Sequence, residues 1–492
     1  MTTISSDTRV GTAPRNLPVA AWAMAASTGV LAAALGALAV LAPPATVPAL
    51  LAVVAVSVAV WQRPALAAVA VIAITPLVAG IDRGRLVPGL RPNEALVVFM
   101  SGILIVRAVV LLPTGWRPSL RMSRLEAVLV WMAIASSVLP IFFMLVRGRT
   151  VEADDISYGM VLWKYLALYL LVRLSVRSER EIHWCLWASM LTGCVVGAVG
   201  FLQALDMLGV RDVLGTYWAP FGHEAALAQP RGGSTLGLPA ATADLMILNL
   251  AVAAGLWWKD RKHGLPLAGV AAVSVLGVLA AAEFSSVLGL VIAACCVAVA
   301  LGRLNLLGYL PVVLAAAAAA VWPVVEHRLT GFQGTAGLPV SWTTRLENLQ
   351  TYFWPELFSG SNPLFGVRPS ARVEVASQGT GYVWIESGYT WLLWGGGVPL
   401  LAAFVALVRV GCRTTWLACR ELTTYRSVAA LAALTGLVVI SVLMIFDPHI
   451  TYRGSADLLF ALFALVALVA PVTVTRPQTH APSLLRTTGD HA

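Results

Sequence analysis

The 20 residues at positions 427–446 read SVAALAALTGLVVISVLMIF and contain no charged side chain. A helix of about this length crosses the hydrocarbon core of a membrane, which is roughly 30 Å thick. Similar runs recur along the 492-residue chain, in which 59% of residues are hydrophobic and 12% are charged. Because soluble domains carry about 25% charged residues, the composition excludes a soluble protein. The sequence predicts an all-α, polytopic transmembrane helical bundle.

The apolar segments predict about 12 to 14 membrane spans. They lie at 18–42, 45–62, 63–81, 94–112, 124–146, 157–175, 181–205, 236–258, 264–282, 284–302, 306–322, 388–410, 426–446 and 457–473. Two connections are longer than a helix–helix loop needs to be. The expected organisation is a tail at 1–17, N-terminal helices at 18–205, a first outer loop at 206–235, central helices at 236–322, a long outer loop at 323–387, C-terminal helices at 388–473 and a tail at 474–492.

The distribution of basic residues predicts the orientation of these spans. With the N-terminus placed in the cytoplasm and the sides alternating, Lys and Arg gather in the inner connections, as at 117–124, 173–180 and 259–262. Cytoplasmic loops are enriched in these residues. Both tails are therefore expected in the cytoplasm. The net charge of +9 follows from this topology and does not indicate binding to nucleic acid.

Cysteine and metal-ligand patterns indicate no covalent or metal centre. The six cysteines fall in apolar segments or in predicted inner loops, so no structural disulfide is expected. No cluster of His, Cys and Asp has the spacing of zinc ligands. Lys164 and Asp244 lie within predicted spans, where an ionisable side chain is a functional candidate by default. A buried ion pair between them is the structural alternative.

The long outer loop contains a predicted surface helix at 341–358. Its apolar stripe consists of Leu346, Leu349 and Phe353, and Arg345 lies in its first turn. Further along, Glu386 stands directly before the span that begins at position 388. Both charged residues are therefore expected near the outer membrane interface.

Four passages in this order resemble the O-antigen ligase and polymerase family of bacterial envelope glycosyltransferases. They are RGGSTLGLP at 231–239, EFSSVLG at 283–289, Arg345 with NPLFG at 362–366, and ESGY at 386–389 followed by LLWGGG at 392–397. The resemblance in loop and helix order covers most of 90–470. It implies glycan transfer from polyprenyl diphosphate at the outer face of the bacterial cytoplasmic (inner) membrane, with no metal, nucleotide or other cofactor. This chain departs from the family pattern at Ser286, where Arg is usual, and at Glu386, where the ligases have His.

The resemblance assigns catalytic roles to three residues. Arg231 and Arg345 would bind the leaving diphosphate, because Arg offsets such charge with paired hydrogen bonds. Glu386 would take the proton of the acceptor hydroxyl if burial raises its pKa toward neutrality. The Glu at this position favours a polymerase that joins lipid-linked repeat units over a ligase that transfers a finished glycan. The structural alternatives are interfacial arginines, and a carboxylate placed at a helix N-terminus by the helix dipole.

Four further residues are candidates for substrate binding. Arg368 follows the turn at Gly366, and Trp384 precedes Glu386. Tyr389 is either an interfacial anchor or a ring that stacks on a sugar, and His327 is either a surface residue or a substrate contact. The expected partners are a polyprenyl-diphosphate-linked glycan donor, a glycan acceptor, membrane lipids and other envelope-polysaccharide synthesis proteins.

A flippase for lipid-linked glycans, or another transporter, is the rival from a different functional class. The number of spans and the intramembrane charges Lys164 and Asp244 favour it. The chain has no nucleotide-binding motif, which excludes ATP-driven transport by this chain alone. A transporter also places polar side chains near the bilayer midplane, whereas the informative polar residues here concentrate in the outer loops.

Overall fold

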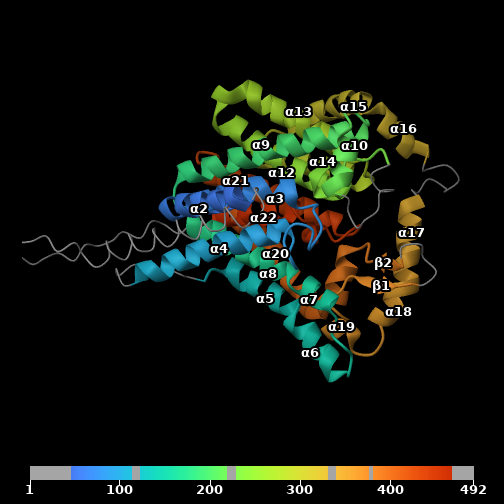
Figure 1. The fold of residues 1–492 in the computed structure, drawn as a ribbon. Coiled ribbons are helices and arrows are strands. Elements are labelled where there is room, and N and C mark those ends of the chain that lie inside the picture. The colour runs from blue at the N-terminus through green and yellow to red at the C-terminus, as the bar shows by residue number, and fades with distance from the viewer. Residues whose placement is uncertain (1–45, 113–121, 219–228, 331–339, 376–380, 468–492) are drawn as a thin grey trace, which may run out of the picture. The chain divides into compact units, whose positions relative to one another are not determined.

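The computed structural model describes residues 46–112, 122–218, 229–330, 340–375 and 381–467 (Figure 1). The predicted span at 18–42 and both predicted tails lie outside these residues. The chain divides into two compact units, Met1–Gln62 and Arg63–Ala492. Helix α2 (Thr46–Gln62) is the described part of the first unit, and all elements discussed below belong to the second.

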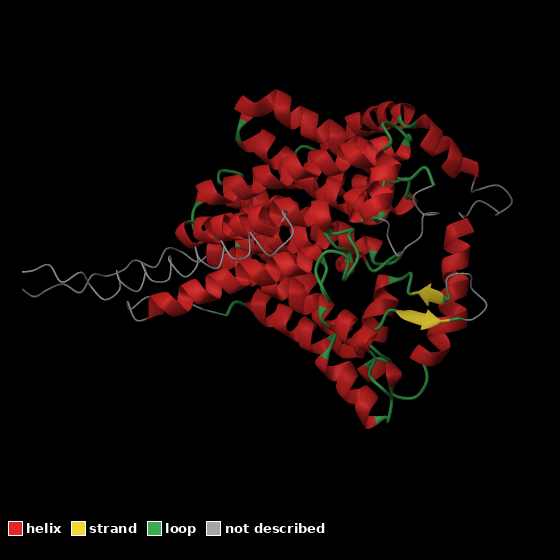
Figure 2. Cartoon of the chain, viewed as in Figure 1, coloured by secondary structure: helices red, strands yellow, loops and turns green. Residues whose placement is uncertain are grey.

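Helices occupy the predicted apolar segments of the second unit, and strands are rare (Figure 2). Among the described residues, seven helices are long and apolar enough to cross a membrane: α4 (Pro92–Leu111), α5 with α6 (Arg124–Val146), α7 with α8 (Ala153–Ser175), α9 (Glu179–Ala204), α12 (Pro239–Lys259), α20 (Gly388–Cys419) and α21 (Tyr425–Leu443). Shorter apolar helices are α3 (Ala65–Val78), α13 (Gly264–Ala280), α14 (Phe284–Ala300) and α22 (Ser455–Val466). The protein is therefore an all-α, multi-pass membrane protein.

A bent pair and several short elements complete the described chain. The segments Leu304–Ala320 (η5, Leu304–Tyr309, and α15, Leu310–Ala320) and Trp322–Thr330 (α16) meet at an angle of 92° and form an eighth candidate span. The short elements are α10 (Val210–Tyr217), η3 (Ser234–Leu236), η4 (Arg261–His263), α19 (Asn362–Phe365), β1 (Arg372–Glu374), β2 (Tyr382–Trp384) and η7 (His449–Thr451).

The centre of the bundle is formed by α12, α21 and α22. Within the apolar windows of α12 and α21, 83% and 78% of residues are buried, against 11% in α4. A helix that is apolar on every side is stable only where neighbouring helices or lipid cover it. The small side chains of these central helices allow close packing: a Cβ at Gly436 of α21 would lie 2.3 Å from Leu248 of α12.

The connections assigned to the outer side meet at one end of this bundle, on the right in Figure 1. Arg83 contacts Glu94 and Ser157, Arg147 contacts Asn362, and Arg345 contacts Asp447. The connections assigned to the inner side meet elsewhere, since Tyr425 N–H donates to Glu179 and Lys259 lies over the Tyr425 ring. The structure thus separates the two sets of loops, and which set faces the cytoplasm stays a prediction from charge.

The helix predicted in the long loop is present, but its inner face differs from the prediction. It comprises α17 (Val340–Asn348), a π-helical turn, η6 (Leu349–Phe353), and α18 (Trp354–Leu357). Leu349 and Phe353 are buried, whereas Leu346 is 47% exposed, so its place in the apolar stripe is wrong. Trp342 packs on Phe446, with ring centroids 4.9 Å apart. Arg345, three residues after Trp342, lies on the same face of α17, because its partners Glu386 and Asp447 adjoin α20 and α21.

The NPLFG turn lies against a break in α20. Gly397 has φ 63° and ψ −159°, which interrupts the helix two residues before Pro399. A Cβ at Gly397 would lie 2.5 Å from the backbone of Leu364 in α19, and the Val367 N–H donates to the Trp394 carbonyl at 2.7 Å. The NPLFG and LLWGGG motifs therefore pack against one another. After NPLFG, the antiparallel strands β1 and β2 precede Glu386.

Candidate functional site

Arg345 joins two carboxylates that come from different parts of the chain. Its Nε lies 3.5 Å from Glu386 Oε1, and its Nη1 lies 2.7 Å from Asp447 Oδ2. Asn348, one turn later on α17, donates from Nδ2 to Glu386 Oε2 at 3.4 Å. The side chain of Arg345 is 20% exposed and that of Asp447 is 11% exposed. Two of the three predicted catalytic residues are therefore in contact.

Close packing between two helix ends holds these carboxylates side by side. The N–H of Gly388, the first residue of α20, donates to the carbonyl of Met444 just after α21, at 2.7 Å. A Cβ at Gly388 would lie 2.3 Å from the Met444 sulfur, so only glycine allows this approach. Glu386 precedes this contact and Asp447 follows it, which places both beside Arg345.

Arg231, the third predicted catalytic residue, belongs to an adjoining group around Glu283. Glu283 stands at the N-terminus of α14, 3.5 Å from Arg231 Nη1 and 3.7 Å from Arg328 Nη2 of α16. The charge of Glu283 also acts on Arg345 and on Glu386, so the two groups are near neighbours. We refer to the set as the arginine–carboxylate cluster; it consists of Arg231, Glu283, Arg328, Arg345, Glu386 and Asp447.

The glycines of the RGGSTLG motif position Arg231. The Gly232 N–H donates to the Ala280 carbonyl at 2.8 Å, and a Cβ at Gly232 would lie 2.6 Å from the Gly200 carbonyl oxygen of α9. Ser234 donates from Oγ to the Val196 carbonyl at 2.7 Å. The motif is thus a close-packed turn on α9 that directs Arg231 toward α14.

Burial moves the pKa of two carboxylates in the cluster, Glu386 and Asp447, toward neutrality. Burial raises the pKa of Glu386, while Arg345 and Asn348 oppose that rise. Burial also raises the pKa of Asp447, to about 6, against the attraction of Arg345. Burial lowers the pKa of the Arg345 guanidinium, but Asp447 and Glu386 outweigh that effect and the pKa is raised. A carboxylate in this range can accept a proton from a hydroxyl group, while the arginines stay charged.

Three members of the cluster were missed by sequence reasoning: Asp447, Arg328 and Glu283, the last quoted within a motif but given no role. Asp447 could have been found from the sequence. It is the first charged residue after the span at 426–446, just as Glu386 is the last charged residue before the span that begins at 388. Arg328 had none, since its approach to Glu283 depends on the bend between α15 and α16. Within the described residues, no three His, Cys, Asp or Glu side chains are grouped as metal ligands.

A fully buried Asp–His pair lies in the helical region beneath the cluster. Asp244 Oδ2 of α12 is 2.7 Å from His449 Nδ1 of η7, and these residues are 2% and 0% exposed. Lys164 pairs instead with Asp457 at 2.9 Å. The predicted ion pair between Lys164 and Asp244 is therefore wrong, because each finds a partner on the segment that contains η7 and α22.

Replacing His449 by alanine is expected to destabilise the protein by about 3–5 kcal/mol, because Asp244 loses its buried partner. Thermal unfolding in detergent, followed by tryptophan fluorescence, measures the effect. His263→Ala is the control, since that exposed side chain lies 3.6 Å from Asp260, and a change within about 0.5 kcal/mol is expected. Equal stability of the two variants would contradict a structural role for the pair.

Two predicted substrate-binding residues are engaged in fixing the long loop. Arg368 forms two hydrogen bonds to Asp155, at 2.9 and 2.8 Å, and one to Glu152 at 2.8 Å. These charge-assisted bonds raise the pKa of Arg368. Trp384, on β2, lies 5.6 Å from the guanidinium of Arg372. Their contacts attach the loop to α7 and the sheet.

The other two candidates also have contacts outside the cluster. Tyr389 donates from its hydroxyl to the Ser441 carbonyl at 2.7 Å and packs edge-on against Phe404. These contacts hold the ring against α20 and α21. His327 is exposed on α16, next to Arg328 in the chain. Of the seven predicted site residues, the structure gathers Arg231, Arg345 and Glu386.

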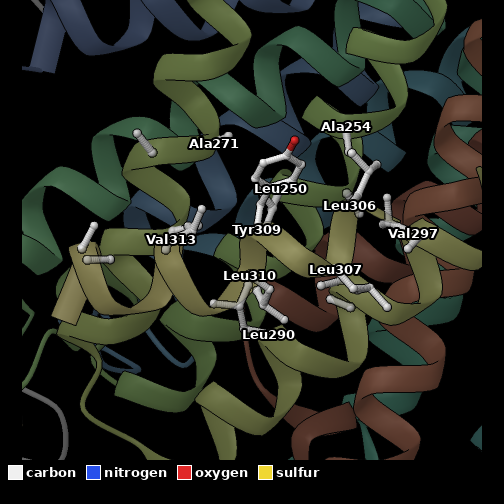
Figure 3. A pocket seen from close by; sticks show the side chains of 18 of the residues that line it. Leu250, Ala254, Ala271, Leu290, Val297, Leu306, Leu307, Tyr309, Leu310 and Val313 are labelled. Carbon is white, nitrogen blue, oxygen red and sulfur yellow. The ribbon is translucent and has the colours of Figure 1, made fainter. Parts of the chain in front are cut away.

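An apolar cavity of about 580 Å³ lies among α12, α13, α14, η5 and α15. Figure 3 shows its lining, in which the hydroxyl of Tyr309 is the one oxygen among the labelled side chains. The lining residues of α14 run from Leu290 to Ala298, and Glu283 stands at the start of the same helix. Ala316 and Ala317 of α15 also line the cavity, and Arg328 follows on α16. The cavity and the cluster are thus built on shared elements.

No family model, curated protein or solved structure matches this chain.

Proposed function

We propose that this chain is an integral membrane glycosyltransferase that polymerises polyprenyl-diphosphate-linked oligosaccharide repeat units at the extracytoplasmic face of the bacterial cytoplasmic membrane. The observation that carries the proposal is the meeting of Arg231, Arg345 and Glu386 in one cluster. These residues come from three separate passages that resemble the O-antigen ligase and polymerase family. The finer topology of about 12 to 14 spans with a long outer loop is part of the same proposal.

The cluster contains the cations that the leaving group requires, and the diphosphate would replace carboxylates that pair with them here. The donor glycan is attached through its anomeric carbon to a diphosphate, and three guanidiniums stand where that group would bind. Arginine recognises phosphate oxygens in pairs, and fixed cations stabilise the charge that develops as the bond breaks. Arg328 stands beside Glu283 at the start of α14, the helix start in which Ser286 replaces the arginine of the family pattern.

The carboxylates supply the proton acceptor. An acceptor hydroxyl attacks the anomeric carbon, its proton passes to Glu386, and the bond from that carbon to the diphosphate oxygen breaks. Polyprenyl diphosphate leaves with the bonding electron pair, and the glycan is longer by the acceptor unit. Asp447, on the other side of Arg345, keeps that arginine oriented.

The apolar cavity supports a lipid-linked donor. Its walls carry almost no polar atoms, so a hydrocarbon chain is the occupant that they favour. The helices that line it, α14 and α15, lead to Glu283 and Arg328. A lipid with its diphosphate at the cluster could therefore place its chain along these helices.

Reconstitution tests this function directly. Purified protein in nanodiscs is incubated with polyprenyl-diphosphate oligosaccharide and EDTA, and products are sized by gel and mass spectrometry. Wild type and Arg149→Ala, which removes an exposed ion pair with Glu356, are expected to give longer glycans and free polyprenyl diphosphate. Glu386→Ala is expected to give neither. Movement of the labelled lipid between leaflets without any new glycosidic bond would instead establish a flippase.

The rate is expected to fall as the pH drops, because Glu386 must be ionised to accept a proton and burial raises its pKa above the usual value of a glutamate. Asn348→Ala removes a hydrogen bond that stabilises the ionised form of Glu386, so the pKa of Glu386 rises. The acid limb of the pH–rate profile should then move to higher pH, with activity recovering at pH 8. Glu347→Gln, on the outward side of α17, is the control. An unmoved limb in Asn348→Ala would remove Glu386 from the role of base.

A further inference from the structure

A second group of arginines, Arg91 and Arg453, lies at the same end of the bundle and forms no ion pair with the described carboxylates. Arg91 directly precedes α4, and Arg453 lies between η7 and α22; both are partly buried. Arg453 donates from Nη1 to the Ala79 carbonyl at 3.3 Å, and the Nε of Arg91 has no partner among the described residues. Neither guanidinium forms an ion pair with a described Asp or Glu.

The charges around these two arginines leave an excess of positive charge. Glu94 is bound by Arg83, with both carboxylate oxygens 3.2 Å from Nη2, and Asp457 is bound by Lys164. Asp82 is the remaining carboxylate that acts on the pair. Burial and, after it, the charge of Arg453 lower the pKa of Arg91 to about 10. The two cations therefore repel one another in a partly desolvated place.

Asn93 adds an unsatisfied amide to the segment that follows Arg91. It lies two residues after Arg91, in the first turn of α4, and is 1% exposed. Neither its Oδ1 nor its Nδ2 has a hydrogen-bond partner among the described residues. Buried amides are almost always satisfied, so the Asn93 Nδ2, an unpaired donor two residues after Arg91, is available to an anionic ligand.

We propose that Arg91, Arg453 and Asn93 bind the diphosphate of a second lipid-linked substrate, the acceptor. This inference rests on the proposed polymerase function. A polymerase holds two lipid diphosphates at once, because donor and acceptor are both lipid-linked, whereas a ligase or a flippase needs one. The arginine–carboxylate cluster has acidic groups for proton transfer and suits the reacting donor. At the Arg91–Arg453 site the nearby carboxylates of Glu94 and Asp457 are already bound by Arg83 and Lys164, so the site suits a group that is held but does not react.

The chain connects the two sites at a suitable separation. Asp447 belongs to the cluster and Arg453 to the second site, six residues apart. Because each residue spans at most about 3.5 Å, their Cα atoms are at most about 20 Å apart. An acceptor reacts at the far end of its oligosaccharide, so its diphosphate must lie about one repeat unit from the cluster.

Binding stoichiometry in the absence of turnover tests the second site. Wild-type protein in nanodiscs with EDTA is titrated with polyprenyl-diphosphate oligosaccharide whose acceptor hydroxyl is blocked, and two equivalents are expected to bind. The double variant Arg91→Gln/Arg453→Gln should bind one equivalent, at the arginine–carboxylate cluster. Arg345→Gln should also bind one equivalent, at the Arg91–Arg453 site. Arg85→Gln, in the same loop as Arg83 but exposed, should bind two. Two equivalents in the double variant would overturn the inference and leave the proposed function untouched.

Further arms separate a lipid headgroup from a free phosphate and a binding effect from a folding effect. Inorganic pyrophosphate competes at the second site if the diphosphate alone is recognised. If the double variant lost pyrophosphate binding but bound the lipid as wild type does, the assignment of the site to a lipid would be overturned. In turnover assays, the double variant should raise the acceptor KM at least tenfold with little change in kcat. Its thermal stability should equal or exceed that of wild type, because repulsion between two cations is relieved. If the double variant does not fold, Arg453→Lys with Arg91→Lys is measured, and an unchanged acceptor KM there overturns the inference.

Discussion

Arg345→Ala is expected to reduce the rate of glycan transfer by about 10²–10³-fold, which is the usual cost of removing one fixed donor to a developing negative charge. Two effects combine in this variant. The leaving diphosphate loses a guanidinium, and Glu386 and Asp447 lose the cation that keeps them ionised. Initial rates of polyprenyl diphosphate release in nanodiscs measure the change.

Arg345→Lys separates these two effects. Lysine keeps the positive charge but cannot make the paired contacts of a guanidinium, so an intermediate rate is expected. Thr344→Ala, at an exposed neighbouring position, controls for disturbance of α17. An Arg345→Ala protein that is as active as wild type would rule out the cluster as the reaction site.

Gly397→Ala is expected to destabilise the protein by more than about 3 kcal/mol. The backbone at φ 63° and ψ −159° belongs to a region that is essentially limited to glycine, and a side chain there costs about 1–3 kcal/mol. The added Cβ would also lie 2.5 Å from the Leu364 carbonyl, so α19 would have to move. Thermal unfolding in detergent and the yield of folded protein measure the loss.

Gly395→Ala is the matched control, two residues earlier in the same helix. The nearest atom to its Cβ would be Leu400 Cδ2 at 4.0 Å, which leaves room for a methyl group. Alanine is favoured over glycine in a helix by up to about 1 kcal/mol, so unchanged or slightly increased stability is expected. If both substitutions had the same effect, the fit between NPLFG and the helix break would not be a source of stability.

The helices could be predicted from sequence because their signal is local. A run such as 427–446 has the length and the lack of charge that a membrane span requires, and α21 occupies most of it. The lateral order of the helices had no such signal. Inside lipid, every face of a span is apolar, and neighbours are selected by the fit of small residues, as where Gly436 meets Leu248.

The candidate site could be predicted only in part for the same reason. Arg345 and Glu386 were identified from a resemblance in short motifs, whereas the approach of Asp447 to Arg345 depends on residues far apart in the chain. The apolar stripe of α17 was predicted from periodicity, which favoured Leu346 over Arg345 on the inner face. The periodicity of one segment contains no information about a carboxylate from a distant part of the chain. Here such carboxylates determine which face of α17 lies against the bundle.

The attachment of the long loop also determines what substrate binding has to achieve. Arg368 fixes the loop to α7 through Asp155 and Glu152, and Arg147 holds it on both sides of α19 through Ser361 and the Gly366 carbonyl. A side chain on such a loop loses little conformational freedom when a ligand arrives. The cluster is therefore preorganised: substrate binding energy does not have to fold the loop and is available for displacing the carboxylates from their arginines.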